Sequence, residues 1–354
     1  MEENKQHKTA LPETEPIPSA QAPEALLDIR GLRVEYHTDE DVVYAVNGLD
    51  LTIGKGESLG LVGETGAGKT TTALSVLRLI ADPPGKIMGG EIWFEGEDML
   101  QAKPARLREI RGSKISVIFQ DPMTSLNPVY SVGDQIAEVI HQHEKCSKEE
   151  GRRKAGDMLE MVGIPRARYD EYPHQFSGGM KQRVVIAMSI ACSPELILAD
   201  EPTTALDVTI QAQVLELMNE LKEKLRTSLL LITHDLGVVA QVCDRVAIMY
   251  AGEIVESGTI AEVFDHPHHP YTIGLFGSIP SLDETAEKLK PIQGQMPDPT
   301  ELPEGCAFAP RCPYATGACR TRKPEMTGVG GTQMVRCLAH QGVFESPELM
   351  EEVR

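Results

Sequence analysis

Apolar and polar positions follow regular patterns along residues 26–258 of the chain. Leu26–Ile53 shows the alternation expected of a strand pair, and Ser58–Val62 is a short apolar run that fits a buried strand. Over Lys69–Ile80 the apolar residues recur at helical spacing instead. The segment between the last two runs is rich in glycine, so the pattern predicts a strand, a glycine loop and a helix.

The remainder of this region repeats strand and helix patterns. Short apolar runs predict strands at Ile115–Phe119, Leu196–Ala199 and Leu229–Ile232 and a hairpin over Arg245–Gly258, and helical spacing predicts helices within Val132–Val162, Met180–Cys192 and Ile210–Leu225. Strands that alternate with helices imply a mainly parallel sheet with helices on both faces. We therefore predict an α/β domain over residues 26–266, with a helical subdomain at about 130–190.

The two ends of the chain depart from this pattern. Residues 1–25 are polar and rich in Pro and Glu, which predicts a disordered tail, and residues 267–354 lose the periodicity and form a predicted C-terminal extension. The net charge of −19 argues against a nucleic-acid binder, which usually carries a basic face. No apolar run approaches the ~20 residues that span a bilayer. We therefore expect a cytosolic protein with reduced thiols.

The glycine loop carries phosphate-binding chemistry, because it fits the pattern G-x-x-x-x-G-K-[ST]. Backbone N–H groups can converge on phosphate oxygens only where side chains are absent. Lys69 is expected to reach the β- and γ-phosphates of ATP, and the Thr70 hydroxyl to bind Mg²⁺. The predicted nucleotide-binding residues of this segment are Gly63, Glu64, Thr65, Gly66, Ala67, Gly68, Lys69, Thr70 and Thr71.

Two carboxylates, Asp200 and Glu201, follow the predicted strand over Leu196–Ala199. The end of this strand is expected to place Asp200 near the magnesium ion, and Glu201 is the candidate to orient or activate the attacking water. The alternative is that both residues only cap a strand, and the phosphate loop favours catalysis over this alternative.

A second anion site is predicted where Ser177, Gly178 and Gly179 open a helix, because backbone N–H groups and the helix dipole both favour phosphate there. The chain thus has two phosphate-binding surfaces but a single lysine loop. Their use on one nucleotide requires a fold that joins them, or two chains that face each other.

Taken in order, these motifs resemble those of the ATP-binding cassette (ABC) ATPases over about residues 26–258. The resemblance places Gln120 at the hinge of the family's glutamine lid, His234 at its switch histidine and Tyr36 where an aromatic ring stacks on adenine. It implies an α/β fold with a RecA-like parallel sheet core, an antiparallel β subdomain and a helical subdomain. It also implies a nucleotide sandwich, in which two cassettes close head to tail on ATP and reopen on hydrolysis. The implied catalytic residues are Lys69, Gln120, Glu201 and His234, the implied magnesium ligands are Thr70, Gln120 and Asp200, and the residues offered to the facing cassette are Ser177, Gly178 and Gly179.

Two longer strings, Tyr172–Met180 and Glu201–Gln213, resemble a narrower group, the ATP-binding subunits of bacterial dipeptide and oligopeptide permeases. Phe176 and Met180 replace the Leu and Gln of the general cassette signature. The resemblance implies a peripheral ATPase on the cytoplasmic face of the bacterial inner membrane that drives peptide import. The implied partners are a second, related ATPase as a heterodimer, two transmembrane permease subunits that contact Asp121–Tyr130, and an extracytoplasmic peptide-binding protein, with no nucleic acid.

Two alternatives to peptide import remain open. Close relatives of these permeases carry nickel or other small solutes, and the ATPase itself does not touch the solute. A soluble cassette ATPase that acts on DNA or ribosomes is the second alternative, which the acidic net charge disfavours.

Four of the seven cysteines, Cys306, Cys312, Cys319 and Cys337, lie in the C-terminal extension. Clustered thiols in a reduced compartment suggest a metal, but the close C-x₂₋₄-C pairs of zinc sites are missing from the sequence. Spacing alone leaves zinc, an iron–sulfur cluster or no metal open. The segment Gly305–Pro313 resembles the tail of peptide-permease ATPases, which can hold a four-iron cluster. That resemblance implies a structural [4Fe–4S] cluster on the four cysteines.

Overall fold

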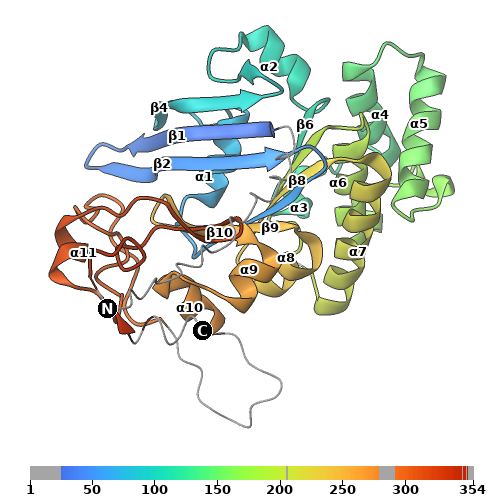
Figure 1. The fold of residues 1–354 in the computed structure, drawn as a ribbon. Coiled ribbons are helices and arrows are strands. Elements are labelled where there is room, and N and C mark those ends of the chain that lie inside the picture. The colour runs from blue at the N-terminus through green and yellow to red at the C-terminus, as the bar shows by residue number, and fades with distance from the viewer. Residues whose placement is uncertain (1–24, 205, 279–291, 345, 348, 350–354) are drawn as a thin grey trace, which may run out of the picture.

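A computed structural model of the protein describes residues 25–204, 206–278, 292–344, 346–347 and 349. The predicted N-terminal tail, apart from Ala25, lies outside the described residues, as do Ala205 and residues 279–291 of the predicted extension. Two β-sheets organise the chain, with helices gathered mainly beside and below the larger one (Figure 1).

The smaller sheet is antiparallel and lies against one face of the larger sheet, with helix α1 between them (Figure 1). Its strand order is β2-β1-β4-β5. The strands are β1 (Ala25–His37), β2 (Val42–Gly54), β4 (Gly85–Phe94) and β5 (Glu97–Asp98). The alternation seen in Leu26–Ile53 thus corresponds to two long paired strands, with Ile29 opposite Leu51.

The larger sheet has eight strands in the order β11-β12-β10-β9-β3-β8-β7-β6. Its strands are β3 (Ser58–Val62), β6 (Ile115–Ile118), β7 (Leu196–Asp200), β8 (Ser228–Thr233), β9 (Arg245–Tyr250), β10 (Glu253–Thr259), β11 (Thr327–Gly330) and β12 (Gln333–Val335). The pairs within β9-β3-β8-β7-β6 are parallel, whereas β10, β12 and β11 add antiparallel pairs at one side. The carboxyl ends of the parallel strands therefore meet along one edge, where α/β sheets bind ligands.

The parallel strands are buried on both faces, as their continuous apolar runs require. In β8, Leu229 and Leu231 join the core on one side, whereas Leu230 and Ile232 join the core on the other. Successive side chains of a strand point to opposite faces, so one short strand supplies both cores. The first core contains most of the helices, and the second contains the small sheet and α1.

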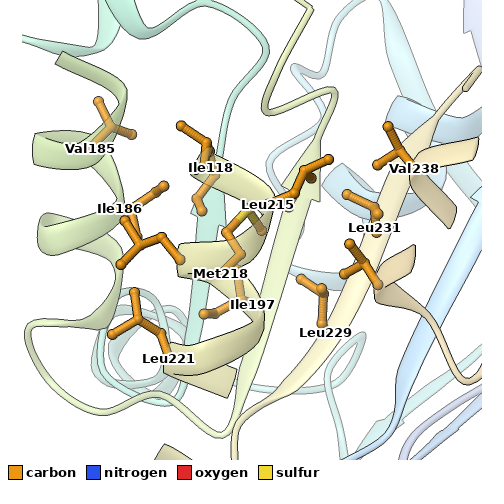
Figure 2. Packing of buried hydrophobic residues seen from close by; sticks show 14 of the residues in the cluster. Ile118, Val185, Ile186, Ile197, Leu215, Met218, Leu221, Leu229, Leu231 and Val238 are labelled. Atoms are coloured by element: carbon orange, nitrogen blue, oxygen red, sulfur yellow. The ribbon is translucent and has the colours of Figure 1, made fainter. Parts of the chain in front are cut away.

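The helices of the first core pack on the parallel strands, as Figure 2 shows for the residues around α7. Met218 and Leu221 of α7 are spaced to lie on one face of that helix. They join Ile197 of β7 and Ile186 of α6 in the same cluster. The helices of the described residues are α1 (Lys69–Val76), α2 (Pro104–Ile110), α3 (Pro122–Ser125), α4 (Val132–His143), α5 (Lys148–Met161), η1 (Arg166–Arg168), η2 (Pro173–Gln175), α6 (Gly178–Ile190), α7 (Val208–Leu225), α8 (Leu236–Val242), α9 (Ile260–Asp265), α10 (Pro270–Phe276) and α11 (Gly317–Thr321).

One predicted helix ends earlier in the structure than expected, and one region of predicted helices divides at a position that the pattern did not specify. The helix expected over Lys69–Ile80 ends at Val76, and Arg78 has a left-handed backbone with φ of 50° that cannot continue a right-handed helix. The helical pattern over Val132–Val162 is two helices, because Ser147 accepts a hydrogen bond from the Glu150 N–H and starts α5 anew.

The C-terminal extension is continuous with the main fold. Strand β12 pairs with β10, and the side chains of Tyr271 and Phe308 lie in the same core as the helices. Glu256 of β10 is fully buried and accepts hydrogen bonds from the backbone N–H groups of His268 and His269. Among the helices described, none combines the length and the apolar character that a membrane span needs.

Candidate functional site

A cleft of about 460 Å³ lies where β3, β6, β7 and β8 end. Its walls come from seven separate parts of the chain. The lining residues are Tyr36, Val43, Ala45, Thr65, Gly66, Gly68, Lys69, Thr70, Thr71, Gln120, Asp200, Glu201, His234 and Pro299. The phosphate loop, the carboxylates, Gln120, His234 and Tyr36 are therefore brought together as the motifs predict.

The phosphate loop connects β3 directly to α1, and its glycines are required by close backbone contacts. A Cβ on Gly63 would lie 2.1 Å from the Met249 carbonyl oxygen, and one on Gly68 would lie 2.3 Å from the Ala45 carbonyl oxygen. Gly68 also has a φ of 102°, a backbone conformation that residues with a side chain rarely adopt. Lys69 begins α1 and is buried, and its ammonium group donates hydrogen bonds to the carbonyl oxygens of Gly63 at 2.7 Å and Glu64 at 2.9 Å.

The Glu201 carboxylate lies at the centre of a set of polar contacts. Its Oε2 accepts hydrogen bonds from Gln120 Nε2 at 2.9 Å and Thr204 Oγ1 at 2.8 Å, and its Oε1 lies 3.1 Å from His234 Nδ1. Glu201 has a φ of 46°, which is unusual for a residue with a side chain. Its N–H donates a hydrogen bond to the Ile232 carbonyl oxygen at 2.8 Å. Gln120 and His234 reach it because their strands end at the same edge of the sheet.

The charged groups of the cleft affect one another's pKa values. Burial lowers the pKa of Lys69, although Glu201, Asp200 and Glu64 act in the opposite direction. Burial raises the pKa of Asp200, which the Thr70 hydroxyl counteracts by donating a hydrogen bond. Burial would also raise the pKa of Glu201, but hydrogen bonds from Thr204 and His234 outweigh it, so this pKa is lowered. Glu201 is therefore ionised at neutral pH.

The chemistry of this donor set fits Mg²⁺ bound together with a nucleotide. Thr70 and Asp200 offer a hydroxyl and a carboxylate side by side. Across the described ranges, no group of three or more His, Cys, Asp or Glu side chains is arranged to hold a metal ion by itself. Mg²⁺ in nucleotide enzymes takes one or two protein ligands and completes its shell with phosphate oxygens and water.

Three of the lining residues belong to none of the predicted motifs. Val43 and Ala45 belong to β2, and Pro299 belongs to the C-terminal extension. The Pro299 carbonyl oxygen accepts a hydrogen bond from the Tyr44 N–H at 2.9 Å. Pro299 matches no motif, so nothing in its local sequence could have placed it beside the phosphate loop. The resemblance did identify Tyr36, whose hydroxyl oxygen lies 3.2 Å from the hydroxyl oxygen of Thr71.

The segment Ser177–Gly179 is not brought into this cleft. Among the described residues that line it, none belongs to that segment. Ser177 caps α6 by accepting a hydrogen bond from the Met180 N–H, and Ser177 and Gly178 are exposed. The predicted second anion site is therefore exposed on the surface, outside the cleft.

The four cysteines of the extension lie within electrostatic range of one another and are free thiols. Burial raises the pKa of Cys306 to about 11 and that of Cys312 to about 12, and the neighbouring cysteines add to both shifts. The Cys306 N–H donates a hydrogen bond to the Cys319 carbonyl oxygen at 2.8 Å. Within the described part of the chain, these four cysteines are not arranged as a group that could hold a metal ion, so the structure does not support the predicted iron–sulfur cluster or its zinc alternative.

Two family profiles match the chain. The ABC transporter profile matches residues 46–204, and the profile of the oligopeptide/dipeptide transporter C-terminal region matches residues 255–319. The first covers the phosphate loop, both carboxylates and Ser177–Gly179. The second begins within β10 and covers most of the extension, including three of the four cysteines.

Individual relatives and structures give the same assignment. The chain is 49% identical over 318 residues to the oligopeptide transport ATP-binding protein AppD of Bacillus subtilis, covering 89% of this chain and 97% of that one. It is 51% identical to the oligopeptide transport ATP-binding protein OppD (88% of each chain) and 48% identical to the dipeptide transport ATP-binding protein DppD (89% and 94%) of the same organism. A dimeric ATP-binding cassette solved in a post-hydrolysis state with ADP and Pi superposes with a TM-score of 0.59 and 28% identity, covering 66% of this chain and 98% of that one. This likeness confirms the predicted cassette fold.

Proposed function

Because this chain belongs to the ABC transporter family of ATPases, we propose that it is the ATP-hydrolysing subunit of a bacterial importer of di- or oligopeptides. The observation that carries the proposal is the double match, of the ABC transporter profile over the ATP cleft and of the oligopeptide/dipeptide profile over the extension. The relatives reported above are all peptide transport proteins, which favours neither nickel transport nor action on nucleic acid.

In the proposed ATP site, the loop N–H groups and Lys69 would hold the phosphates, and Tyr36 would stack on adenine. Thr70 and Asp200, with Gln120, would hold the Mg²⁺ ion, which neutralises charge on the phosphates when bound. Burial of Lys69 and Asp200 supports these roles, because charges in a partly dehydrated cleft act more strongly than in water.

Glu201 would orient the attacking water and accept its proton. Support comes from the lowered pKa of this carboxyl, which keeps it charged, and from the three side chains that fix its direction. Among these, Gln120 and His234 lie on segments that follow β6 and β8, so a shift of either strand end would alter the position of the carboxylate.

We further propose that ATP is held between two chains, with Ser177, Gly178 and Gly179 completing the site of a second, related ATPase. Support comes from the outward position of this segment and from a similar cassette solved as a dimer. The γ-phosphate would favour the closed pair, and hydrolysis would remove that contact.

A second cleft, of about 650 Å³, supports the proposal that the chain docks on the permease subunits at the cytoplasmic face of the membrane. It lies between β6 and the helices α4 and α6, and apolar side chains such as Phe119, Val139 and Met188 line it. Phe119 is 47% exposed, and the following segment adds Val129 and Tyr130, which are 71% and 54% exposed. Exposed apolar residues, here Phe119 in the wall of the cleft and Val129 and Tyr130 later in the same part of the chain, are typical of a protein interface.

Recovery of the tagged chain from detergent-solubilised membranes tests the importer assignment. We expect two polytopic membrane proteins and a second cassette ATPase to co-purify with it. Phe119→Glu should lose the membrane proteins by placing a charge in the apolar cleft, whereas Met88→Glu, which changes an exposed apolar residue of β4, should retain them. Recovery of the unchanged chain without membrane proteins would contradict the proposal.

We also propose that Cys306, Cys312, Cys319 and Cys337 hold a [4Fe–4S] cluster with a structural role. The motivation is the resemblance of Gly305–Pro313 to tails that hold a four-iron cluster, together with four free thiols within electrostatic range of one another. Cluster binding would have to draw these thiols together, because the described structure does not arrange them as a metal site. Protein purified without oxygen should contain about four iron atoms per chain and absorb in the visible range. Removal of the iron by a chelator should lower the thermal unfolding temperature of the protein. Protein purified without oxygen that contains no iron and does not absorb in the visible range would contradict this proposal.

A further inference from the structure

The phosphate loop is joined to the C-terminal extension by an ion pair. Arg311 donates hydrogen bonds to both carboxylate oxygens of Glu64, from Nη1 at 2.8 Å and from Nη2 at 3.1 Å. The Arg311 side chain is only 5% exposed. A two-point contact from a buried guanidinium defines both distance and orientation, which a single surface pair does not.

Several other contacts hold Arg311 in place. Its Nε donates a hydrogen bond to the Gln293 carbonyl oxygen at 3.1 Å, and Nη1 lies 3.4 Å from the Tyr250 hydroxyl. The guanidinium lies 5.8 Å from the ring centre of Tyr250 and 6.0 Å from that of Phe308. Arg311 directly precedes Cys312, so the segment that carries two of the four cysteines also carries this contact.

Glu64 links these contacts to Lys69. Its N–H donates a hydrogen bond to the Tyr271 hydroxyl at 3.0 Å, and its carbonyl oxygen accepts one from the Lys69 ammonium group. The side chain, the N–H and the carbonyl of Glu64 are therefore held by Arg311, Tyr271 and Lys69, respectively. Two of these three partners, Arg311 and Tyr271, come from residues beyond 266.

The pair also matters for charge. Glu64 is close enough to Lys69 to act on its ammonium group, after Glu201 and Asp200. A carboxylate without a partner at that position would repel the triphosphate that Lys69 meets. Arg311 supplies the compensating positive charge through its two hydrogen bonds to that carboxylate.

We propose that Arg311 is a positioning residue of the ATP site, which holds the phosphate loop through Glu64 and cancels the charge of that carboxylate. The C-terminal extension is thereby part of the ATPase machinery. This inference rests on the proposed ATP site and adds to it a residue that no nucleotide-binding motif contains.

The test measures Mg-ATP affinity with a fluorescent ATP analogue for the full chain and its variants. Arg311→Met, which keeps the apolar stem and removes the charge, is expected to weaken binding about tenfold, as loss of one partner from a buried pair should. The loss should shrink at high salt, because the Glu64 carboxylate is partly exposed and its repulsion of the triphosphate is screened there. Glu64→Gln in the same chain should restore affinity to within about threefold of the unchanged protein, because it removes the repelling carboxylate.

Arg336→Ala is the matched control. Arg336 lies in the same extension and donates to the carbonyl oxygens of Ile254 and Pro324, away from Glu64, so affinity should stay within about twofold. Equal affinity of Arg311→Met and the unchanged chain overturns the inference, as does a double variant that remains tenfold weak. The double variant lacks both charges and can be assayed even where the single variant does not fold. Failure of the unchanged chain to bind ATP would instead overturn the proposed function.

Discussion

Glu201→Gln is expected to reduce ATP turnover at least about a hundredfold while leaving Mg-ATP affinity within a few-fold of the unchanged protein. Glutamine has the shape of glutamate, so the contacts with Thr204 and His234 can largely persist, but it carries no charge to orient water or accept its proton. Lys69 and the phosphate loop are untouched by the change. Steady-state hydrolysis and equilibrium nucleotide binding, measured on the assembled ATPase, separate the two effects.

The same chemical change at Glu216 is the control for this experiment. Glu216 lies exposed on α7, outside the cleft, so Glu216→Gln should hydrolyse ATP at the normal rate. Normal turnover by Glu201→Gln would show that another group activates the water. Loss of binding together with turnover would instead indicate that Glu201 supports the loop.

Gly178→Asp is expected to abolish turnover of the assembled pair, again at least about a hundredfold, without disturbing the chain that carries it. A Cβ at Gly178 would meet only Leu206, at 3.8 Å, which is ordinary contact. An acidic residue in the first turn of α6 also suits the helix dipole. In the closed pair, however, the new carboxylate would face the partner's triphosphate. Hydrolysis by the pair and nucleotide binding by the isolated chain provide the measurement.

Two other glycines were compared with Gly178, one as an alternative test position and one as the control. Gly179 is unsuitable for the test because its Cβ would lie 2.3 Å from Ile210 Cγ2 and disturb the packing of α6 on α7. Gly317 also begins a helix, is exposed and has open space around it, so Gly317→Asp should leave hydrolysis by the pair unchanged. Full activity of the Gly178→Asp chain, independent of protein concentration, would refute the shared site.

Continuous motifs were sufficient to predict most of the residues that line the cleft. A phosphate loop is a local structure, in which glycines and a helix start within a few residues of one another, so Gly63–Thr70 indicated its own conformation. The strand ends before Gln120, Asp200 and His234 were likewise readable, because buried parallel strands are short apolar runs. Their meeting at one edge follows from the parallel order of the strands.

The helical patterns predicted helices but not all of their limits. The end of α1 at Val76 and the break between α4 and α5 depend on the backbone of Arg78 and on the cap at Ser147. Such local conformations compete with helical spacing, which continues through both positions. The sequence therefore indicated where helices lie more reliably than where each one stops.

By itself, the sequence determined the ATP-binding motifs, the order of the parallel strands along the chain and the family, since each depends on residues that are neighbours in the chain. Only the tertiary structure decided that Arg311 meets Glu64, that Pro299 lines the cleft, and that β12 extends the main sheet. These contacts join segments far apart in the chain, and many arginines and glutamates could have paired. Packing of the whole core selects one arrangement among them, and local sequence patterns do not specify which distant segments come into contact.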